Sequence, residues 1–469
     1  MTSTLIKNIE LLGTQEILDI YINAGKIEAI QKNLNYPADK TFNAEGGLAI
    51  PGLNDHHIHL LSTAAAANSL NCDPQIMTRQ AFIDALKHHN QQTGKVWLRG
   101  IQYHPNLAGE IDRYYLDQYC PNQPVRIQHR GGRLWILNTA ALNLLALNIF
   151  NAKQGVEIID GELSGRLYEL DQWLAEQLNS VMPDLKSISH QLARYGITGL
   201  TDTSPRNDID YWRHFTQQQQ NGHLLQYVRM MGNLSLAKAE SSAKLTIGEV
   251  KIHLLESNLP DIQDVAETIL SARKQQRNIA AHCVTLSELV FFLGALDLAG
   301  GGQFGDRIEH GSIIHDDLLA SIKQHHLRVV TQPHFIHSRG DQYLLDVETI
   351  DLPNLYRLRS LITAGIPLAA GSDSPYGSYD PWYAMQAAIN RQTKQKITLE
   401  ADEALTPENA LTLYTSPLDA PGRHKTTLRV GDIANICLLK YPWHQIKQRM
   451  RAEDVRATWI DGINVYKSD

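Results

Sequence analysis

Two histidines, His57 and His59, are separated by a single residue in the run Asp55-His56-His57-Ile58-His59. Residues two apart in a β-strand point to the same face, so the two imidazoles can converge on one ion. Neutral imidazole is a common metal ligand, and histidine is abundant here, with 20 residues. The pair alone is weak evidence, because it also suits a structural or surface position.

Three further groups follow apolar runs that are typical of strands: His282, His310 and Asp373. Taken singly, His282 suits a buried core position and His310 suits a surface turn. Taken together with the histidine pair, they place four imidazoles and one carboxylate at the C-terminal ends of predicted strands. Barrel enzymes build their sites at that edge, so the pattern predicts a metal centre.

Lys251 lies between β-branched residues in another predicted strand, Val250-Lys251-Ile252-His253-Leu254. Burying an unpaired ammonium group is costly, so this lysine must be paired, neutralised or chemically changed. One interpretation is an exposed head group or an ion pair with Glu249 or Glu256. The other is a carboxylated lysine, whose carbamate bridges two metal ions.

Residues 51–419 alternate strand-like apolar runs with helical stretches, which is typical of a parallel sheet wrapped by helices. The eight strand-like runs are the core of 48–60, 125–129, 198–203, 249–255, 279–282, 307–310, 327–332 and 366–372. They predict an α/β fold of the (β/α)8 TIM-barrel type. A doubly wound sheet is the alternative, but no glycine-rich phosphate fingerprint follows the first strand.

Residues 1–50 and 420–469 read as short strands and turns rather than as further βα units. A hairpin signal, Ala24-Gly25, separates two runs near the start, and Asp461-Gly462 follows a run near the end. We therefore expect both ends of the chain to form one small, discontinuous β-sandwich domain around the barrel.

The composition narrows the choice of partner and compartment. The net charge of −7 offers no basic surface for nucleic acid or an anionic membrane. The four cysteines form no CxxC pair, and no apolar run approaches the roughly 20 residues of a membrane span. We expect a cytoplasmic protein with a small-molecule substrate, and a homodimer as its candidate assembly.

Several local sequences resemble those of one enzyme superfamily. They are Pro51-Gly52-Leu53-Asn54-Asp55-His56-His57-Ile58-His59, Asp160-Gly161-Glu162-Leu163-Ser164-Gly165, Arg307-Ile308-Glu309-His310 and Gly371-Ser372-Asp373-Ser374-Pro375. The closing Gly431-Asp432-Ile433-Ala434-Asn435 is similar to a GxxAD turn. Over essentially its whole length the chain resembles the amidohydrolase superfamily, and within it the YtcJ-like branch, related to formamide deformylases and D-aminoacylases.

The resemblance implies that His57, His59 and Asp373 hold one metal ion and that His282 and His310 hold a second. Nitrogen and oxygen ligands suit Zn²⁺, with Mn, Fe or Co as alternatives, at one or two ions per chain. Asp373 would take a proton from the metal-bound water and deliver it to the leaving amine.

The resemblance also implies that a carboxylated Lys251 bridges the two ions. The sequence departs from the family pattern at two points. The Lys251 segment lacks the usual downstream Asp-Gly and continues as Leu254-Leu255-Glu256-Ser257. Arg133 stands where many YtcJ-like sequences have a histidine, and an arginine neither accepts a proton nor binds a metal. The substrate contact at that point should therefore differ.

Four residues of the predicted βα loops are candidates for binding the substrate: Arg130, Arg133, Arg166 and His334. An arginine can clamp a carboxylate through two hydrogen bonds, which favours an acidic substrate such as an N-acyl amino acid or a cyclic ureide. Each arginine also suits an ordinary salt bridge. His334 is the stronger candidate, because Gln332-Pro333-His334 directly follows a predicted strand.

The sequence thus favours a metal-dependent hydrolase that cleaves a C–N bond in an amide, N-formyl or N-acyl group, carbamate or cyclic ureide. One alternative is a single-metal deaminase of an aminated heterocycle, in which Lys251 is purely structural. Another is a non-catalytic barrel scaffold. The complete set of candidate ligands argues against the scaffold.

Overall fold

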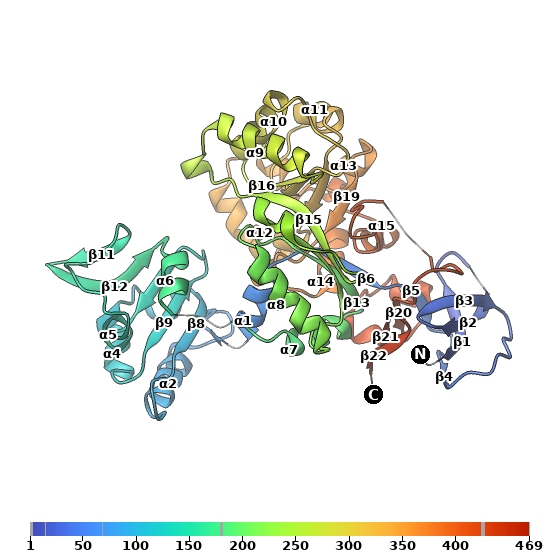
Figure 1. The fold of residues 1–469 in the computed structure, drawn as a ribbon, viewed down its shortest axis with the longest axis horizontal. Coiled ribbons are helices and arrows are strands. Elements are labelled where there is room, and N and C mark those ends of the chain that lie inside the picture. Colours follow the sequence, from blue (N-terminus) through green and yellow to red (C-terminus); the bar gives the residue numbers. More distant parts are fainter. Residues whose placement is uncertain (1–2, 15, 68, 179–181, 424–426, 469) are drawn as a thin grey trace. The chain divides into compact units, whose positions relative to one another are not determined.

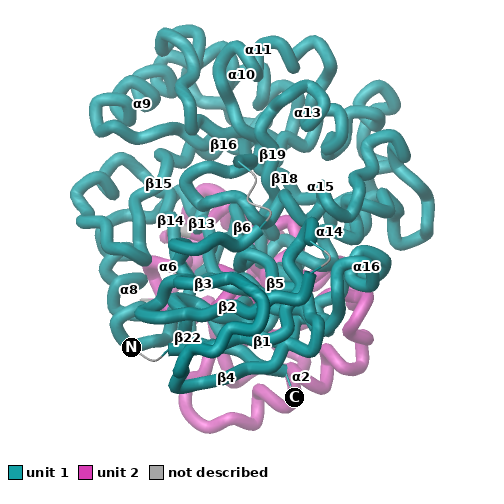
Figure 2. The backbone as a smooth tube through the Cα atoms, turned by 90° about the vertical axis from the view of Figure 1, so that its right-hand side faces the viewer, with its two compact units in different colours: residues 1–60, 184–469 teal, residues 61–183 magenta. Residues whose placement is uncertain are grey.

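The computed structural model describes residues 3–14, 16–67, 69–178, 182–423 and 427–468. The chain divides into two compact units, coloured separately in Figure 2. The first combines residues 1–60 with 184–469, and the second spans residues 61–183. Among the described residues, no helix is long and apolar enough to cross a membrane.

The first unit contains an eight-stranded sheet in which every neighbouring pair is parallel (Figure 1). Its strands, in order across the sheet, are β19 (Leu368–Ala370), β18 (Arg328–Thr331), β17 (Arg307–His310), β16 (Ile279–Cys283), β15 (Leu245–Ile252), β14 (Tyr227–Gly232), β13 (Ile197–Asp202) and β6 (Leu53–Ile58). A parallel bridge between Ile58 and Ser374 joins the two edges. The sheet is therefore a nearly closed barrel, as predicted.

Amphipathic helices follow the strands of the barrel. In α9 (Ile262–Lys274) the buried residues fall at helical spacing: Val265, Ala266, Ile269 and Ala272. α10 (Leu286–Leu298) begins in a capping box between Thr285 and Glu288, which satisfies otherwise unpaired amides of its first turn. The other helices of this unit include α7 (Lys186–Arg194), α8 (Ile209–Gln220), α11 (Leu319–Gln324), α12 (His334–Asp346), α13 (Arg359–Thr363), α14 (Pro381–Asn390), α15 (Pro407–Thr412) and α16 (Trp443–Ile446).

One predicted barrel strand is wrong, and one real strand was missed. Val125–His129 forms β9 in the sheet of the second unit, whereas β14 occupies the vacant position in the barrel. β14 carries the charged Arg229 near its centre, so its sequence does not look like a strand of a buried sheet. In the structure the Arg229 side chain contacts the Glu249 carboxylate of β15 at 3.2 Å, and this partner offsets the cost of burial.

Both chain ends contribute to a second sheet of the first unit, also of eight strands. They are β1 (Thr4–Leu11), β2 (Ile17–Asn23), β3 (Lys26–Gln31), β4 (Lys40–Asn43), β5 (Leu48–Pro51), β20 (Ile436–Leu439), β21 (Val455–Ile460) and β22 (Ile463–Lys467). β5 pairs with β20, which joins the two ends, and a buried cluster that includes Ile20 and Trp459 packs this sheet. The expected domain boundaries at residues 50 and 420 stay a prediction.

Residues 61–183 form their own sheet of six strands rather than a βα connection of the barrel. The strands are β7 (Leu70–Asn71), β8 (Leu98–Tyr103), β9 (Val125–His129), β10 (Leu134–Leu137), β11 (Val156–Ile159) and β12 (Glu162–Tyr168), and the helices include α1 (Leu60–Ala67), α2 (Arg79–Asn90), α3 (Pro105–Ala108), α4 (Arg113–Tyr119), α5 (Thr139–Leu144) and α6 (Asp171–Gln177). One core cluster joins Val125 and Ile127 to Leu116, and another joins Trp135 to Leu167. The unit thus has hydrophobic cores of its own.

The barrel closes where β19 and the residues after it meet β6. The amide of Asp373 donates to the carbonyl of His57 at 2.7 Å. Between them Gly371 lies so close that an added Cβ would stand 2.3 Å from the His57 nitrogen. Only glycine fits this seam without displacing one of the two segments.

We therefore expect Gly371→Ala to lower the free energy of unfolding by about 1–3 kcal/mol, as overpacking does in other cores. The matched control is Gly294→Ala in α10, where the new methyl would meet only Ile262, at 3.4 Å. Alanine is preferred over glycine in helices, so the control should be as stable as the wild type or more so. Urea unfolding measures both, and equal stabilities of the two variants would contradict a tight seam.

Candidate metal centre

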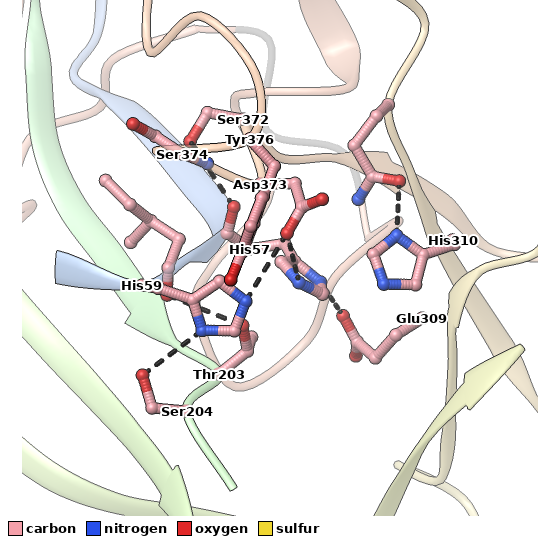
Figure 3. Close-up of polar contacts among 12 residues, drawn as sticks. His57, His59, Thr203, Ser204, Glu309, His310, Ser372, Asp373, Ser374 and Tyr376 are labelled. Carbon is pink, nitrogen blue, oxygen red and sulfur yellow. Dashed lines mark hydrogen bonds and ion pairs between the residues drawn. The ribbon is translucent and has the colours of Figure 1, made fainter. Parts of the chain in front are cut away.

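Three of the predicted ligands meet at the mouth of the barrel (Figure 3). The His57 and His59 Nε2 atoms lie 3.3 and 3.4 Å from the same carboxylate oxygen of Asp373. The possible ligand atoms of the three residues all lie within 4.8 Å of one another. Two imidazole nitrogens and a carboxylate oxygen suit a divalent transition metal, so the group could hold one ion.

Asp373 and His310 have an unusual backbone conformation, which sets the direction of their side chains. Asp373 and His310 have φ values of +51° and +71°, in the left-handed region that non-glycine residues seldom adopt. Such conformations persist only where the surrounding structure holds them, and they cluster at functional sites. Asp55 supplies part of that hold, because its carboxylate accepts the amides of Ser372 at 2.9 Å and His57 at 3.1 Å.

Glu309 fixes the orientation of the His57 ring. Its carboxylate makes a very short hydrogen bond with His57 Nδ1, and its other oxygen lies 2.7 Å from Arg307 Nε. Burial would raise the pKa of Glu309, but Arg307, Lys251 and His57 hold that pKa well below its usual range. The carboxylate therefore stays charged, and Nδ1 donates to it. This leaves the Nε2 lone pair facing Asp373, in position to bind a metal.

Two other imidazoles have comparable partners. His59 Nδ1 lies 3.2 Å from the Ser204 hydroxyl, and His310 Nδ1 lies 2.8 Å from the Gln332 side-chain oxygen. The sequence analysis identified none of these partners. The sequence did offer one signal, which is position: Glu309 directly precedes His310, and Gln332 directly follows β18.

The structure also brings the remaining predicted ligands to this end of the barrel. The His310 ring lies 4.7 Å from that of His57 and 4.5 Å from that of His282, between ring centroids. Lys251 is buried on β15, and its Nζ has no hydrogen-bond partner among the residues described. Burial lowers the pKa of Lys251 more than the nearby Glu309 carboxylate raises it.

His334 begins α12 and is fully buried beneath the loop that follows Asp373. A Cβ on Gly377 would stand 2.2 Å from its Nε2, so the loop packs directly on the ring. Neither ring nitrogen has a hydrogen-bond partner within the described part of the chain. Burial and Arg339 lower the pKa of His334 to about 3, which keeps the ring neutral. Its contact with a substrate stays a prediction.

The three arginines predicted to bind substrate all belong to the unit of residues 61–183. Arg133 lies 3.6 Å from the exposed Glu169, and Arg166 lies 3.5 Å from Glu110. Arg130 is exposed directly after β9. Two of the three thus form the salt bridges that were the alternative interpretation, and their role in substrate binding stays a prediction.

The chain is similar in sequence to known amidohydrolases over most of its length. The model of a family described as the amidohydrolase family matches residues 40–466. The chain is 24% identical to an N-substituted formamide deformylase from Arthrobacter pascens, over 92% of this chain and 90% of that protein. It is 21% identical to the putative amidohydrolase YtcJ of Bacillus subtilis (strain 168), over 83% of each.

A solved structure shares the fold: an uncharacterized metal-dependent hydrolase from Pyrococcus horikoshii OT3. It is similar with a TM-score of 0.76 at 20% identity, over 94% of this chain and 97% of that chain. At this identity the likeness concerns the fold alone.

The contact with Glu309 predicts a measurable effect on metal binding. Glu309→Gln keeps the shape of the side chain but removes the charge that fixes the His57 ring, so metal affinity should fall roughly 10- to 100-fold. Titration of the metal-free protein against a chromophoric chelator measures this. The control is Glu249→Gln, a buried glutamate that contacts Arg229. Unchanged affinity in Glu309→Gln, or an equal loss in the control, would contradict the assignment.

Proposed function

The chain belongs to the amidohydrolase family, and we propose that this metal-dependent hydrolase of carbon–nitrogen bonds cleaves an amide, N-formyl, N-acyl, carbamate or cyclic ureide bond in a small molecule. The observation that carries the proposal is the convergence of His57, His59 and Asp373 on one point. Similarity to a formamide deformylase over 92% of the chain favours the N-formyl and N-acyl members of this set.

His57, His59 and Asp373 would hold the ion, with Zn²⁺ the preferred metal and Mn, Fe or Co the alternatives. A bound Zn²⁺ lowers the pKa of a coordinated water from roughly 15.7 to about 7 and polarises the substrate carbonyl. Burial would raise the pKa of Asp373, but the neighbouring rings of His57, His59 and His310 hold it well below its usual range. The carboxylate is therefore free to accept the proton of the attacking water and to return it to the leaving amine.

Lys251 decides between a one-ion and a two-ion form of this centre. A buried ammonium with no partner among the described residues is unfavourable, and it would repel a cation beside it. Carboxylation turns the group into an anionic carbamate, which suits a bridge between the ion held by His57 and His59 and a second ion on His282 and His310. We include this bridge in the proposal.

A single-ion deaminase of an aminated heterocycle is the second candidate. The group of His57, His59 and Asp373 is by itself a set of ligands for one ion, and this observation favours it. In that case Lys251 would be a structural residue. The two candidates differ in their product. The deaminase releases ammonia from a ring, whereas the first candidate frees an amine from an acyl group or opens a ureide ring.

The proposed substrate-binding residues are Arg130, Arg133, Arg166 and His334. Because arginine binds carboxylates through paired hydrogen bonds, we propose an acidic substrate. The described cysteines, Cys72, Cys120, Cys283 and Cys437, are all free and buried. Free thiols are usual in a reducing compartment, which supports the cytoplasm as the proposed location.

We expect His57→Ala and Asp373→Asn to lower turnover by at least about 100-fold, because each removes a metal ligand and the second also removes the proton acceptor. A panel of N-formyl amines, N-acyl amino acids, cyclic ureides and aminated heterocycles measures the effect, with released amine or ammonia as the readout and, for the cyclic ureides, the ring-opened acid. The control is His190→Ala on α7, an exposed histidine that should keep full activity. Near-normal turnover in either site variant, with the fold intact by circular dichroism, would rule out the mechanism.

A further inference from the structure

Two arginines face one another on the sheet of residues 61–183. Arg99 of β8 and Arg126 of β9 occupy paired positions in the parallel ladder, so both side chains project from the same face. β8 and β9 lie side by side in Figure 1. Like charges at directly opposite positions destabilise a sheet, so this pairing needs a compensating interaction.

Aromatic rings supply part of the compensation. The Arg126 guanidinium lies 5.3 Å from the ring centroid of Trp135 and 5.7 Å from that of Trp97. Arg99 also lies over Trp135, at 5.7 Å, and donates a hydrogen bond to the Ser69 hydroxyl at 3.1 Å. Contacts of this kind hold the planes of the guanidinium groups but neutralise no charge.

A negative partner for Arg126 is missing from the described part of the chain. Its Nε is buried and makes no hydrogen bond there, and the acidic groups described form no ion pair with it. Burial and the neighbouring Arg99 lower the pKa of Arg126 to about 10, so the group is still charged at neutral pH. The nearby Asp171 is engaged otherwise, since it accepts hydrogen bonds from Trp135 at 2.8 Å and Gln128 at 3.2 Å.

Another arginine of the same unit shows the usual arrangement. Arg113 stacks over the ring of Tyr114 at 4.5 Å, much as Arg126 stacks over its tryptophans. Unlike Arg126, it forms a salt bridge with a carboxylate, that of Glu162. The stacking is shared by both sites, and the acidic partner is what distinguishes them.

We propose that Arg99 and Arg126, held by Trp97 and Trp135, form a binding site for the oxyanion group of a small ligand, a carboxylate or a phosphate. The planar fork of an arginine matches both groups through paired hydrogen bonds. An anion between the two side chains replaces their mutual repulsion with two attractive contacts. The proposal does not rest on the proposed chemistry at His57 and Asp373, and occupancy of this site does not depend on turnover.

The test is isothermal titration of the full-length, metal-loaded protein with inorganic phosphate and, separately, with acetate, at constant ionic strength set with sodium chloride. We expect saturable binding of at least one anion, and the tighter binder identifies the ligand class. Arg126→Met keeps the apolar stem and removes the charge, and it should weaken binding at least about 10-fold, since hydrogen bonds to charged groups are among the strong ones. The matched control Arg113→Met should bind as the wild type does.

Two results would overturn the proposal. The first is the absence of saturable binding of either anion by the wild-type protein, which needs no variant to fold. The second is equal binding by wild type and Arg126→Met, which would place the anion elsewhere. Arg99→Met provides the same comparison if Arg126→Met does not fold. A failure of hydrolysis in the substrate panel would leave the outcome of this titration unaffected.

Discussion

The hydrogen bond from the amide of Asp373 to the carbonyl of His57 joins the first and last strands of the barrel, and the metal centre depends on it. Gly371 allows the two segments to approach, and the Asp55 carboxylate joins them again through the amides of Ser372 and His57. The three convergent ligands belong to these two segments. Closing the barrel and assembling the centre are therefore one structural event.

A series of contacts between buried polar side chains extends from this seam to strand β17 in the barrel wall. Arg307 contacts Glu309, Glu309 holds the His57 ring, and His57 faces Asp373. Buried ion pairs give little net stability, because the loss of solvation offsets their attraction. Their value here is orientation, since each contact removes a rotational choice from the next side chain. Such a wall presents imidazole nitrogens to a metal with little rearrangement on binding.

The sequence was sufficient to place His57, His59 and Asp373 together, because ligands at the C-terminal ends of parallel strands meet at one edge. It was insufficient for the assignment of every strand. The run 125–129 alternates apolar and polar residues, which suits a strand of either sheet, and local pattern does not say which sheet a strand joins. β14 was hidden by Arg229, whose partner Glu249 lies on another strand. The partners of the imidazoles were missed for the same reason, since Glu309 and Gln332 act through contacts that only the folded barrel creates.

The most direct test of this account is the metal content per chain of freshly purified protein, measured together with its intact mass in bicarbonate buffer. The account predicts two bound divalent ions per chain and an added carboxylate on Lys251. One ion with an unmodified lysine would retain the site at His57, His59 and Asp373 but contradict the bridged centre. The absence of tightly bound metal would contradict the central claim that closure of the barrel builds a metal site.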